Sequence, residues 1–158
     1  MKKWQRRTVG ILTLGGSGAG LVIVLGQIFG TSVATIGFAI LMVALILFAI
    51  GIAAGVLVLE NHKLARTLAL PFWAIQIPAI STPWVTYEFS SGARFNFLLA
   101  QGGNINFTWA AGSQFSFYIG QHSAVALGVN ILAIAVFWVL FDDVDLLPDD
   151  APHVADDL

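Results

Sequence analysis

The side chains that could do acid–base, nucleophilic or metal chemistry are few and widely separated along this chain of 158 residues. Its histidines are His62, His122 and His153, and the first two are expected to lie roughly 30 Å apart, on opposite faces of a bilayer. Glu60 and Glu88 likewise fall on opposite sides, so they cannot act as a carboxylate pair. The absence of cysteine excludes thiol chemistry and disulfides. The sequence therefore predicts a protein that is not an enzyme, with no catalytic, cofactor-binding or metal-binding residues.

Two amide side chains form a candidate intramembrane polar site. Gln76 lies between Pro71 and Pro78, where a proline-broken helix leaves backbone carbonyl groups free for a partner or an ion. Asn130 falls near the middle of the last apolar stretch, where a buried amide usually bridges helices. Gln76 and Asn130 either line a polar path or hydrogen-bond helices together. We favour the second interpretation because no ionisable residue joins them.

Glycines are frequent in the two apolar stretches nearest the N-terminus. The cluster at residues 15–20 does not bind phosphate, because it lacks the G-x-G-x-x-G spacing and a preceding strand. Gly16 with Gly20, and Gly51 with Gly55, are small-xxx-small pairs that let helix backbones approach closely. We expect these pairs to pack helices within the chain rather than to dimerise it.

Three glycines ten residues apart, Gly92, Gly102 and Gly112, mark a repeat in which large apolar residues alternate with polar or smaller ones. A period of two is typical of a strand with one buried face. Three-residue turns ending at these glycines keep the faces aligned and require a positive φ at each glycine. The repeat predicts a four-stranded antiparallel β-meander, with strands near 84–89, 93–99, 103–109 and 113–119.

The meander places large apolar side chains on one face and polar ones on the other. Its only charges, Glu88 and Arg94, are expected to pair across neighbouring strands. Exposing the apolar face to water would forfeit on the order of 20 kcal/mol, and no other segment is amphipathic enough to be a soluble lid. We expect protein rather than lipid to cover this rigid, flat face. The predicted interaction face comprises Phe95, Phe97, Phe107, Trp109, Phe115 and Phe117.

The composition indicates a membrane protein. Charged residues make up 10% of the chain and hydrophobic residues 58%, and the mean hydropathy is +0.85. About 20 apolar residues span the hydrocarbon core, and four stretches approach or exceed that length. The first is longer than a secretory signal core, so we expect it to remain as an uncleaved helix. The stretches cover residues 8–29, 33–59, 64–82 and 121–141.

Basic residues predict the orientation in the membrane. Four of them precede the first apolar stretch, and Lys63 and Arg66 lie between the second and third, whereas only Arg94 falls on the other side. The positive-inside rule therefore places both termini in the cytoplasm and residues 84–120 outside. Residues 142–158 are acidic without a basic residue, which predicts a solvated, largely disordered tail.

These patterns together predict a polytopic α-helical protein of the cell (inner) membrane, with four transmembrane helices and an extracytoplasmic four-stranded β-meander between the third and fourth.

The leading hypothesis for its function is a non-catalytic integral membrane protein that assembles through its outer sheet, as a homo-oligomer or as an accessory subunit of a larger complex. The alternative is a small channel or transporter that uses the proline-broken third helix. The expected partners are membrane lipid and a further copy or another membrane protein, with no nucleic acid. The predicted domains are residues 1–83, 84–120, 121–141 and 142–158.

Overall fold

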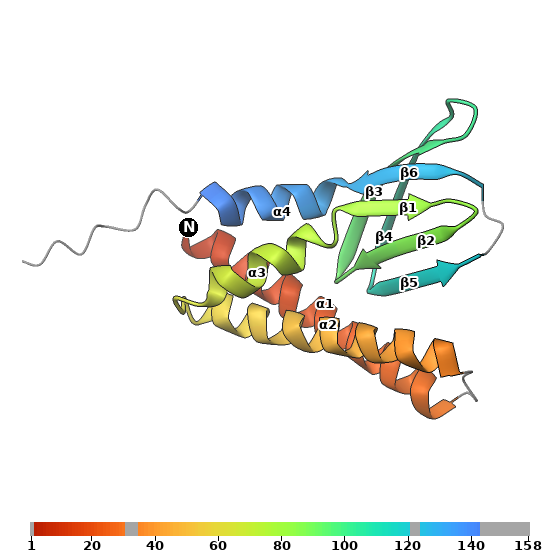
Figure 1. The fold of residues 1–158 in the computed structure, drawn as a ribbon. Coiled ribbons are helices and arrows are strands. Elements are labelled where there is room, and N and C mark those ends of the chain that lie inside the picture. The colour runs from red at the N-terminus through yellow and green to blue at the C-terminus, as the bar shows by residue number, and fades with distance from the viewer. Residues whose placement is uncertain (1, 31–34, 121–123, 143–158) are drawn as a thin grey trace, which may run out of the picture.

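The chain folds into a long helical hairpin with a bent sheet beside part of its length (Figure 1). The computed structural model describes residues 2–30, 35–120 and 124–142. Outside them lie His122, His153, the acidic segment 143–158, and most of the connection between the first two helices. The elements are α1 (Lys3–Gly30), α2 (Thr35–Leu59), α3 (Ala65–Ala74), β1 (Pro78–Ser81), β2 (Val85–Ser90), β3 (Ala93–Ala100), β4 (Ile105–Ala111), β5 (Gln114–Ile119), β6 (Ala126–Asn130) and α4 (Ile131–Asp142).

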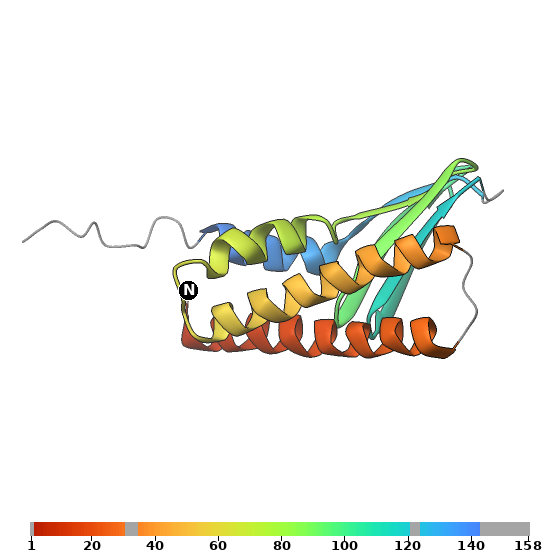
Figure 2. The same cartoon turned by 60° about the horizontal axis from the view of Figure 1, so that its bottom comes forward.

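Helices α1 and α2 pack against each other as an antiparallel hairpin, which Figure 2 shows from the side. A Cβ atom added at Gly20 would lie 2.2 Å from the ring of Phe48, and one added at Gly55 would lie 2.7 Å from the backbone nitrogen of Leu14. The prediction that small residues pack helices within the chain is confirmed at these positions. Both helices are long and apolar enough to cross a membrane.

The prediction of four transmembrane helices is wrong, because only α1 and α2 are candidate spans among the described helices. The third apolar stretch is divided into α3, which ends at Ala74, and β1, which begins at Pro78. The described part of the fourth contains β6, which ends at Asn130, and then α4. With 10 and 12 residues, α3 and α4 reach only about half of a hydrocarbon core. The sequence of a short apolar run does not distinguish a strand from a helix. In the third and fourth stretches, pairing within the sheet made β1 and β6 strands.

The six strands form one antiparallel sheet in the order β4-β3-β6-β1-β2-β5. The predicted strands are present as β2 to β5, and β3 pairs with β4 as a meander requires. The four-stranded meander is nevertheless wrong, because β2 pairs with β1 and β5 and not with β3, in a sheet of six strands. The β2–β5 and β3–β4 pairings share one register, from Val85 opposite Ile119 to Leu99 opposite Ile105. Residues 85–100 and 105–119 are therefore the two long arms of a single hairpin.

This hairpin bends where Gly92 faces Gly112, and the N–H of Gly112 donates to the carbonyl of Gly92 at 2.8 Å. The φ angles of the two glycines are 88° and 121°, and that of Gly102 is 95°, so the predicted positive values are confirmed. Only Gly102 lies in a turn, at the tip of the hairpin. Gly92 and Gly112 instead allow both arms to bend, so that β1 and β6 pair between the two halves.

The bend gives the two halves of the apolar face different surroundings. In the β2–β5 half, Phe89 is 1% exposed, and its ring centre lies 5.3 Å from that of Phe48 in α2 and 5.8 Å from that of Phe72 in α3. Helices of the same chain therefore cover this half, contrary to the expectation that no segment could do so. The β3–β4 half of the same face remains open.

Candidate functional site

The polar face of the sheet holds a charged cluster that joins strands from both halves. Glu88 of β2 and Arg94 of β3 form an ion pair, with Oε1 and Nη1 3.3 Å apart and about a quarter or less of each side chain exposed. The predicted pairing of these residues is confirmed, but β2 and β3 are not neighbours in the sheet. The bend at Gly92 turns the polar faces of the two halves toward each other, and this brings the charges together.

Amide side chains complete the cluster around the Glu88 carboxylate. Nδ2 of Asn96 donates to Oε1 at 2.7 Å, and Nε2 of Gln114 donates to Oε2 at 3.4 Å. Arg94 also donates to the side-chain oxygen of Gln114. One carboxylate thus accepts hydrogen bonds from two side chains and forms an ion pair with a third, and all three lie on β3 and β5. Because β3 and β5 belong to different halves of the bent hairpin, the cluster stabilises the bend.

A cavity of about 310 Å³ lies beside this cluster, between the two halves of the sheet. Small residues on the central strands make room for it. Its size is at the lower end of the range for ligand pockets, and its hydroxyl groups and ion pair suit a small polar molecule or water. Its lining includes Ala79, Ser81, Thr86, Glu88, Arg94, Thr108 and Ala126.

The structure places Gln76 and Asn130 at junctions between a helix and a strand, and not inside helices: Gln76 lies between α3 and β1, and Asn130 is the last residue of β6 before α4. Oε1 of Gln76 accepts from the N–H of Ser91 at 2.8 Å, and its Nε2 donates to the carbonyl of Phe72 at 3.1 Å. Oδ1 of Asn130 accepts from the N–H of Phe95 at 3.2 Å and caps the first turn of α4. With 1% and 2% exposure, both amides are buried, and each holds the backbone of the bent arm.

The bend also rests directly on the middle of α1. A Cβ atom at Gly16 would lie 2.2 Å from the backbone nitrogen of Gly92, so only glycine allows this contact. Ser17 and Ser91 share a hydrogen bond of 3.0 Å between their hydroxyl oxygens, and the hydroxyl of Ser113 donates to the carbonyl of Gly16. The sequence predicted close helix packing at Gly16 but not a sheet there, because isolated serines carry no pattern that points to a contact.

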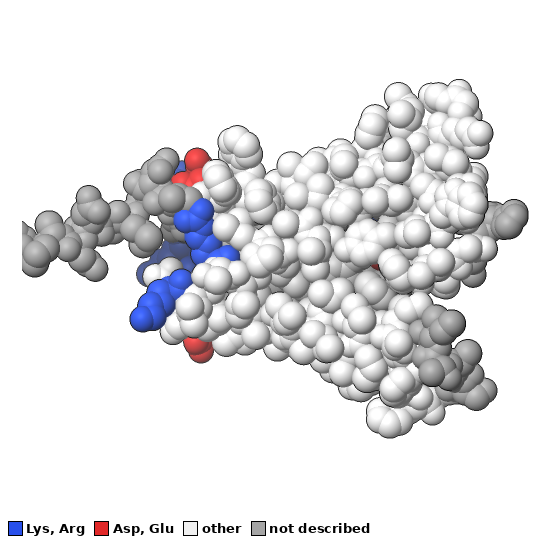
Figure 3. Space-filling model, viewed as in Figure 1, with Lys and Arg blue, Asp and Glu red and all other residues white. Residues whose placement is uncertain are grey.

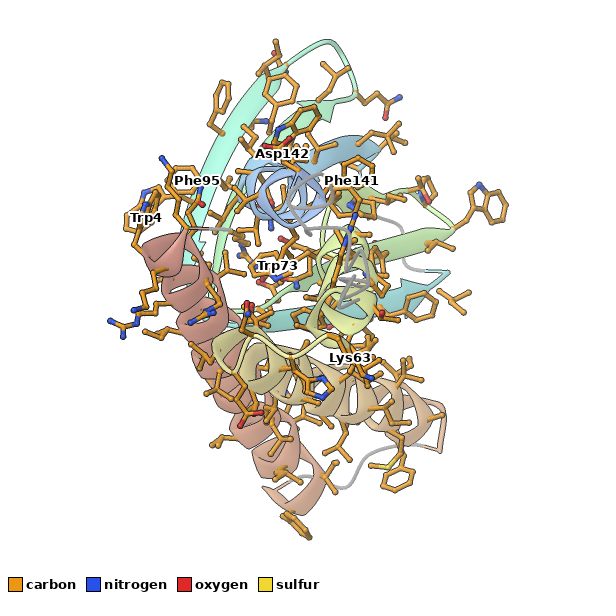
Figure 4. The ribbon with its side chains drawn as sticks, turned by 90° about the vertical axis from the view of Figure 1, so that its left-hand side faces the viewer. Trp4, Lys63, Trp73, Phe95, Phe141 and Asp142 are labelled. Carbon is orange, nitrogen blue, oxygen red and sulfur yellow. The ribbon has the colours of Figure 1, made fainter. Side chains whose placement is uncertain are left out.

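The predicted interaction face is divided between the two halves. Phe115 and Phe117 lie on β5, where they are partly buried. Phe95, Phe97, Phe107 and Trp109 lie together on β3 and β4, and the exposed fractions of Phe107 and Trp109 are 73% and 74%. The ring centres of Phe97 and Phe107 are 5.2 Å apart. We call these four side chains the outer aromatic face; Figure 4 shows Phe95 at the edge of the molecule and Trp73 at its centre.

Charged side chains gather at one end of the molecule, as Figure 3 shows, and the rest of the visible face is almost free of charge. This end contains the start of α1, the connection between α2 and α3, and the end of α4. The guanidinium of Arg66 lies 5.8 Å from the ring centre of Phe141, which ties the last two of these together. Between Arg66 and Asp142, Glu88 and Arg94 are the only acidic or basic residues other than histidine.

Among the described residues, no three His, Cys, Asp or Glu side chains lie where they could hold a metal ion. No protein-family model, curated protein or solved structure matches the chain.

Proposed function

We propose that this protein is a non-catalytic integral membrane protein, held in the bilayer by the α1–α2 hairpin, that assembles through the outer surface of its sheet. The assembly is a homo-oligomer or a larger membrane complex in which the chain is an accessory subunit. One observation carries this proposal. An uncharged, largely apolar surface continues from the helical hairpin onto the sheet, whereas the exposed charges gather at one end.

The position of the sheet along α1 supports membrane depth for the sheet as well. Thr8 begins the uncharged part of α1, and Gly16, which holds the bend, is eight residues further on. Eight residues of helix rise about 12 Å, less than half of a hydrocarbon core of roughly 30 Å. From the bend, β5 runs beside the second half of α1, as far as Gln27, with hollows of about 250 and 470 Å³ between them. A bilayer that surrounds the hairpin therefore also surrounds much of the sheet.

The side chains of the sheet fit this placement. The large apolar residues of β3 and β4 point outward, and Glu88 and Arg94 are paired on the inner side. A charge at membrane depth is costly unless it is paired or faces the protein interior. Such an arrangement, apolar outside and ionic inside, suits lipid surroundings better than water.

The orientation follows from the basic residues. The charged end contains the start of α1, with Lys3, Arg6 and Arg7, and the connection from α2 to the first turn of α3, with Lys63 and Arg66. The positive-inside rule then assigns this end, and with it both termini, to the cytoplasmic side of a cell membrane.

The alternative function, a small channel or transporter, depends on Gln76 and Asn130 facing a water-filled path. Both amides are almost fully buried, and their oxygens accept from backbone N–H groups. This observation favours a structural role for both residues, so we retain assembly as the proposed function.

Replacing Phe107 and Trp109 together with serine tests the proposal. Because both side chains project from the outer aromatic face, we expect the variant to insert and fold but to lose the native mass of the assembly in mild detergent. Trp84→Ser is the matched control, since Trp84 is 78% exposed but lies between β1 and β2. Extraction of the unmodified protein from membranes by alkaline carbonate, or an unchanged native mass of the double variant, would contradict the proposal.

A further inference from the structure

We infer that the partner at the outer aromatic face is a second copy of this chain, and that the β4 strands of the two copies pair antiparallel around a two-fold axis at Thr108. This inference rests on the proposed function, which leaves the partner open between a further copy and another protein.

The unpaired backbone of β4 is the first observation. In this hairpin the two arms are hydrogen-bonded through residues with even numbers. The N–H of Ala100 donates to the carbonyl of Asn104, and the N–H of Gly112 donates to the carbonyl of Gly92. Since bonding and non-bonding pairs alternate along an antiparallel ladder, the backbone groups of odd-numbered residues in β4 point away from β3. The four residues whose N–H and C=O groups point outward are Ile105, Phe107, Trp109 and Ala111.

Because β4 is an edge strand of the sheet, these eight groups have no partner strand among the described residues. At membrane depth there is no water to bond to them, and each unsatisfied group costs several kcal/mol in hydrocarbon. Open sheet edges therefore do not face lipid in membrane proteins, which either close the sheet or cover its edge with protein. Lipid cannot form hydrogen bonds with the outward backbone groups of β4, whereas another strand can.

The sequence of β4 also lacks the features that keep edge strands apart. Natural edge strands are usually protected from pairing with another chain by lysine or another charged residue, or by proline. Residues 105–111 read Ile-Asn-Phe-Thr-Trp-Ala-Ala, with no charge and no proline. The second edge of the sheet, β5, faces the α1–α2 hairpin across the hollows that contain Gln27 and Leu41, so an added strand does not have the same access there. An open edge that can pair with itself favours a closed, symmetric dimer.

Symmetry then determines the register. Antiparallel pairing about Thr108 sets Ile105 opposite Ala111 of the second copy and Phe107 opposite Trp109 of the second copy. All four outward residues of each strand are then in hydrogen-bonded pairs. The aromatic side chains of both copies meet on one face, where cross-strand aromatic pairs add to stability. Centring the axis on Phe107 instead would leave Ala111 of both copies unpaired.

Thr108→Cys tests the register, because the chain contains no other cysteine. In the inferred dimer, Thr108 of one copy lies opposite Thr108 of the second copy. The two residues form a non-hydrogen-bonded pair, in which the Cα atoms are about 4.5 Å apart. That separation is within the range of natural disulfides. We expect mild oxidation in native membranes to convert most of the variant into a covalent dimer that reducing agent reverses.

Asn106→Cys is the matched control, since the two copies of residue 106 would be offset by four residues, about 13 Å along the strand. Alone it should not cross-link, but co-expressed with an Ala110→Cys chain it should give a mixed dimer. Failure of Thr108→Cys to cross-link, or equal cross-linking by Asn106→Cys alone, would overturn the inference. If cross-linking fails while the native mass still depends on Phe107 and Trp109, the proposed assembly stands and the partner is another protein.

Discussion

At the scale of single residues, Glu88 is the most constrained side chain of the sheet. Its carboxylate forms an ion pair with Arg94 and accepts hydrogen bonds from Asn96 and Gln114, and these partners come from strands on both sides of the bend. Hydrogen bonds to a charged group are stronger than those between neutral groups, and losing their acceptor leaves several donors unsatisfied at once. The stability of the bend should therefore depend on this one residue.

Glu88→Leu is expected to lower the free energy of unfolding by roughly 2–3 kcal/mol, because two amide groups lose their acceptor and Arg94 loses its ion-pair partner in a site that is only about a quarter exposed. Glu88→Gln, which keeps an acceptor oxygen and the side-chain size, should cost less. Chemical unfolding in detergent micelles measures both. Glu60→Leu is the control, since Glu60 is exposed at the charged end. Equal stability of the Glu88→Leu and Glu60→Leu proteins would show that the cluster does not hold the sheet.

At the scale of elements, the contact between α1 and the bend fixes the sheet relative to the membrane anchor. The helix contributes a glycine and a serine on one face, and the sheet contributes Gly92, Ser91 and Ser113. Since backbone meets backbone here, neither side can yield to an added methyl group. This contact is the reason that the sheet lies beside α1.

Gly16→Ala should lower the free energy of unfolding by about 1–3 kcal/mol, because its Cβ would overlap the backbone at Gly92. Gly15→Ala is the matched control on the same helix, since a Cβ there meets nothing within 4 Å. That change should be neutral or stabilise the helix by up to about 1 kcal/mol. Unfolding of both variants in detergent distinguishes them. If the two alanines have the same effect, the sheet does not rest on α1 at this point.

At the scale of the whole molecule, the distribution of charge predicts the orientation. His62 lies in the connection between α2 and α3, at the charged end, and Gln101 lies at the tip of the long hairpin, between β3 and β4. Both residues are exposed, so a cysteine at either position can react.

In intact cells, Gln101→Cys should react with a membrane-impermeant thiol reagent, whereas His62→Cys should react only after the cells are opened. The reason is the positive-inside rule, which assigns the basic end to the cytoplasm. Thiol labelling followed by gel shift measures the reaction. Labelling of residue 62 in intact cells, with protection of residue 101, would reverse the orientation.

Several features of this protein could be predicted from the sequence alone, because they depend on local patterns. The alternation of apolar and polar residues gave the strands β2 to β5 and the composition of their faces. The spacing of the repeat glycines predicted their positive φ angles. The spacing of small residues predicted the close packing of α1 with α2. The lengths of α1 and α2 followed from uninterrupted apolar runs without proline.

The sequence could not decide which strands are neighbours, because pairing β2 with β5 depends on contacts between residues as far apart as Val85 and Ile119. It also could not show that the third and fourth apolar stretches each contain a helix and a strand. Those strands exist because β1 and β6 pair with each other and with the arms of the hairpin, and short apolar segments take the structure that tertiary pairing offers. The tertiary structure alone placed Gln76 and Asn130 at helix–strand junctions and divided the aromatic face, since the bend at Gly92 and Gly112 buries one half and exposes the other.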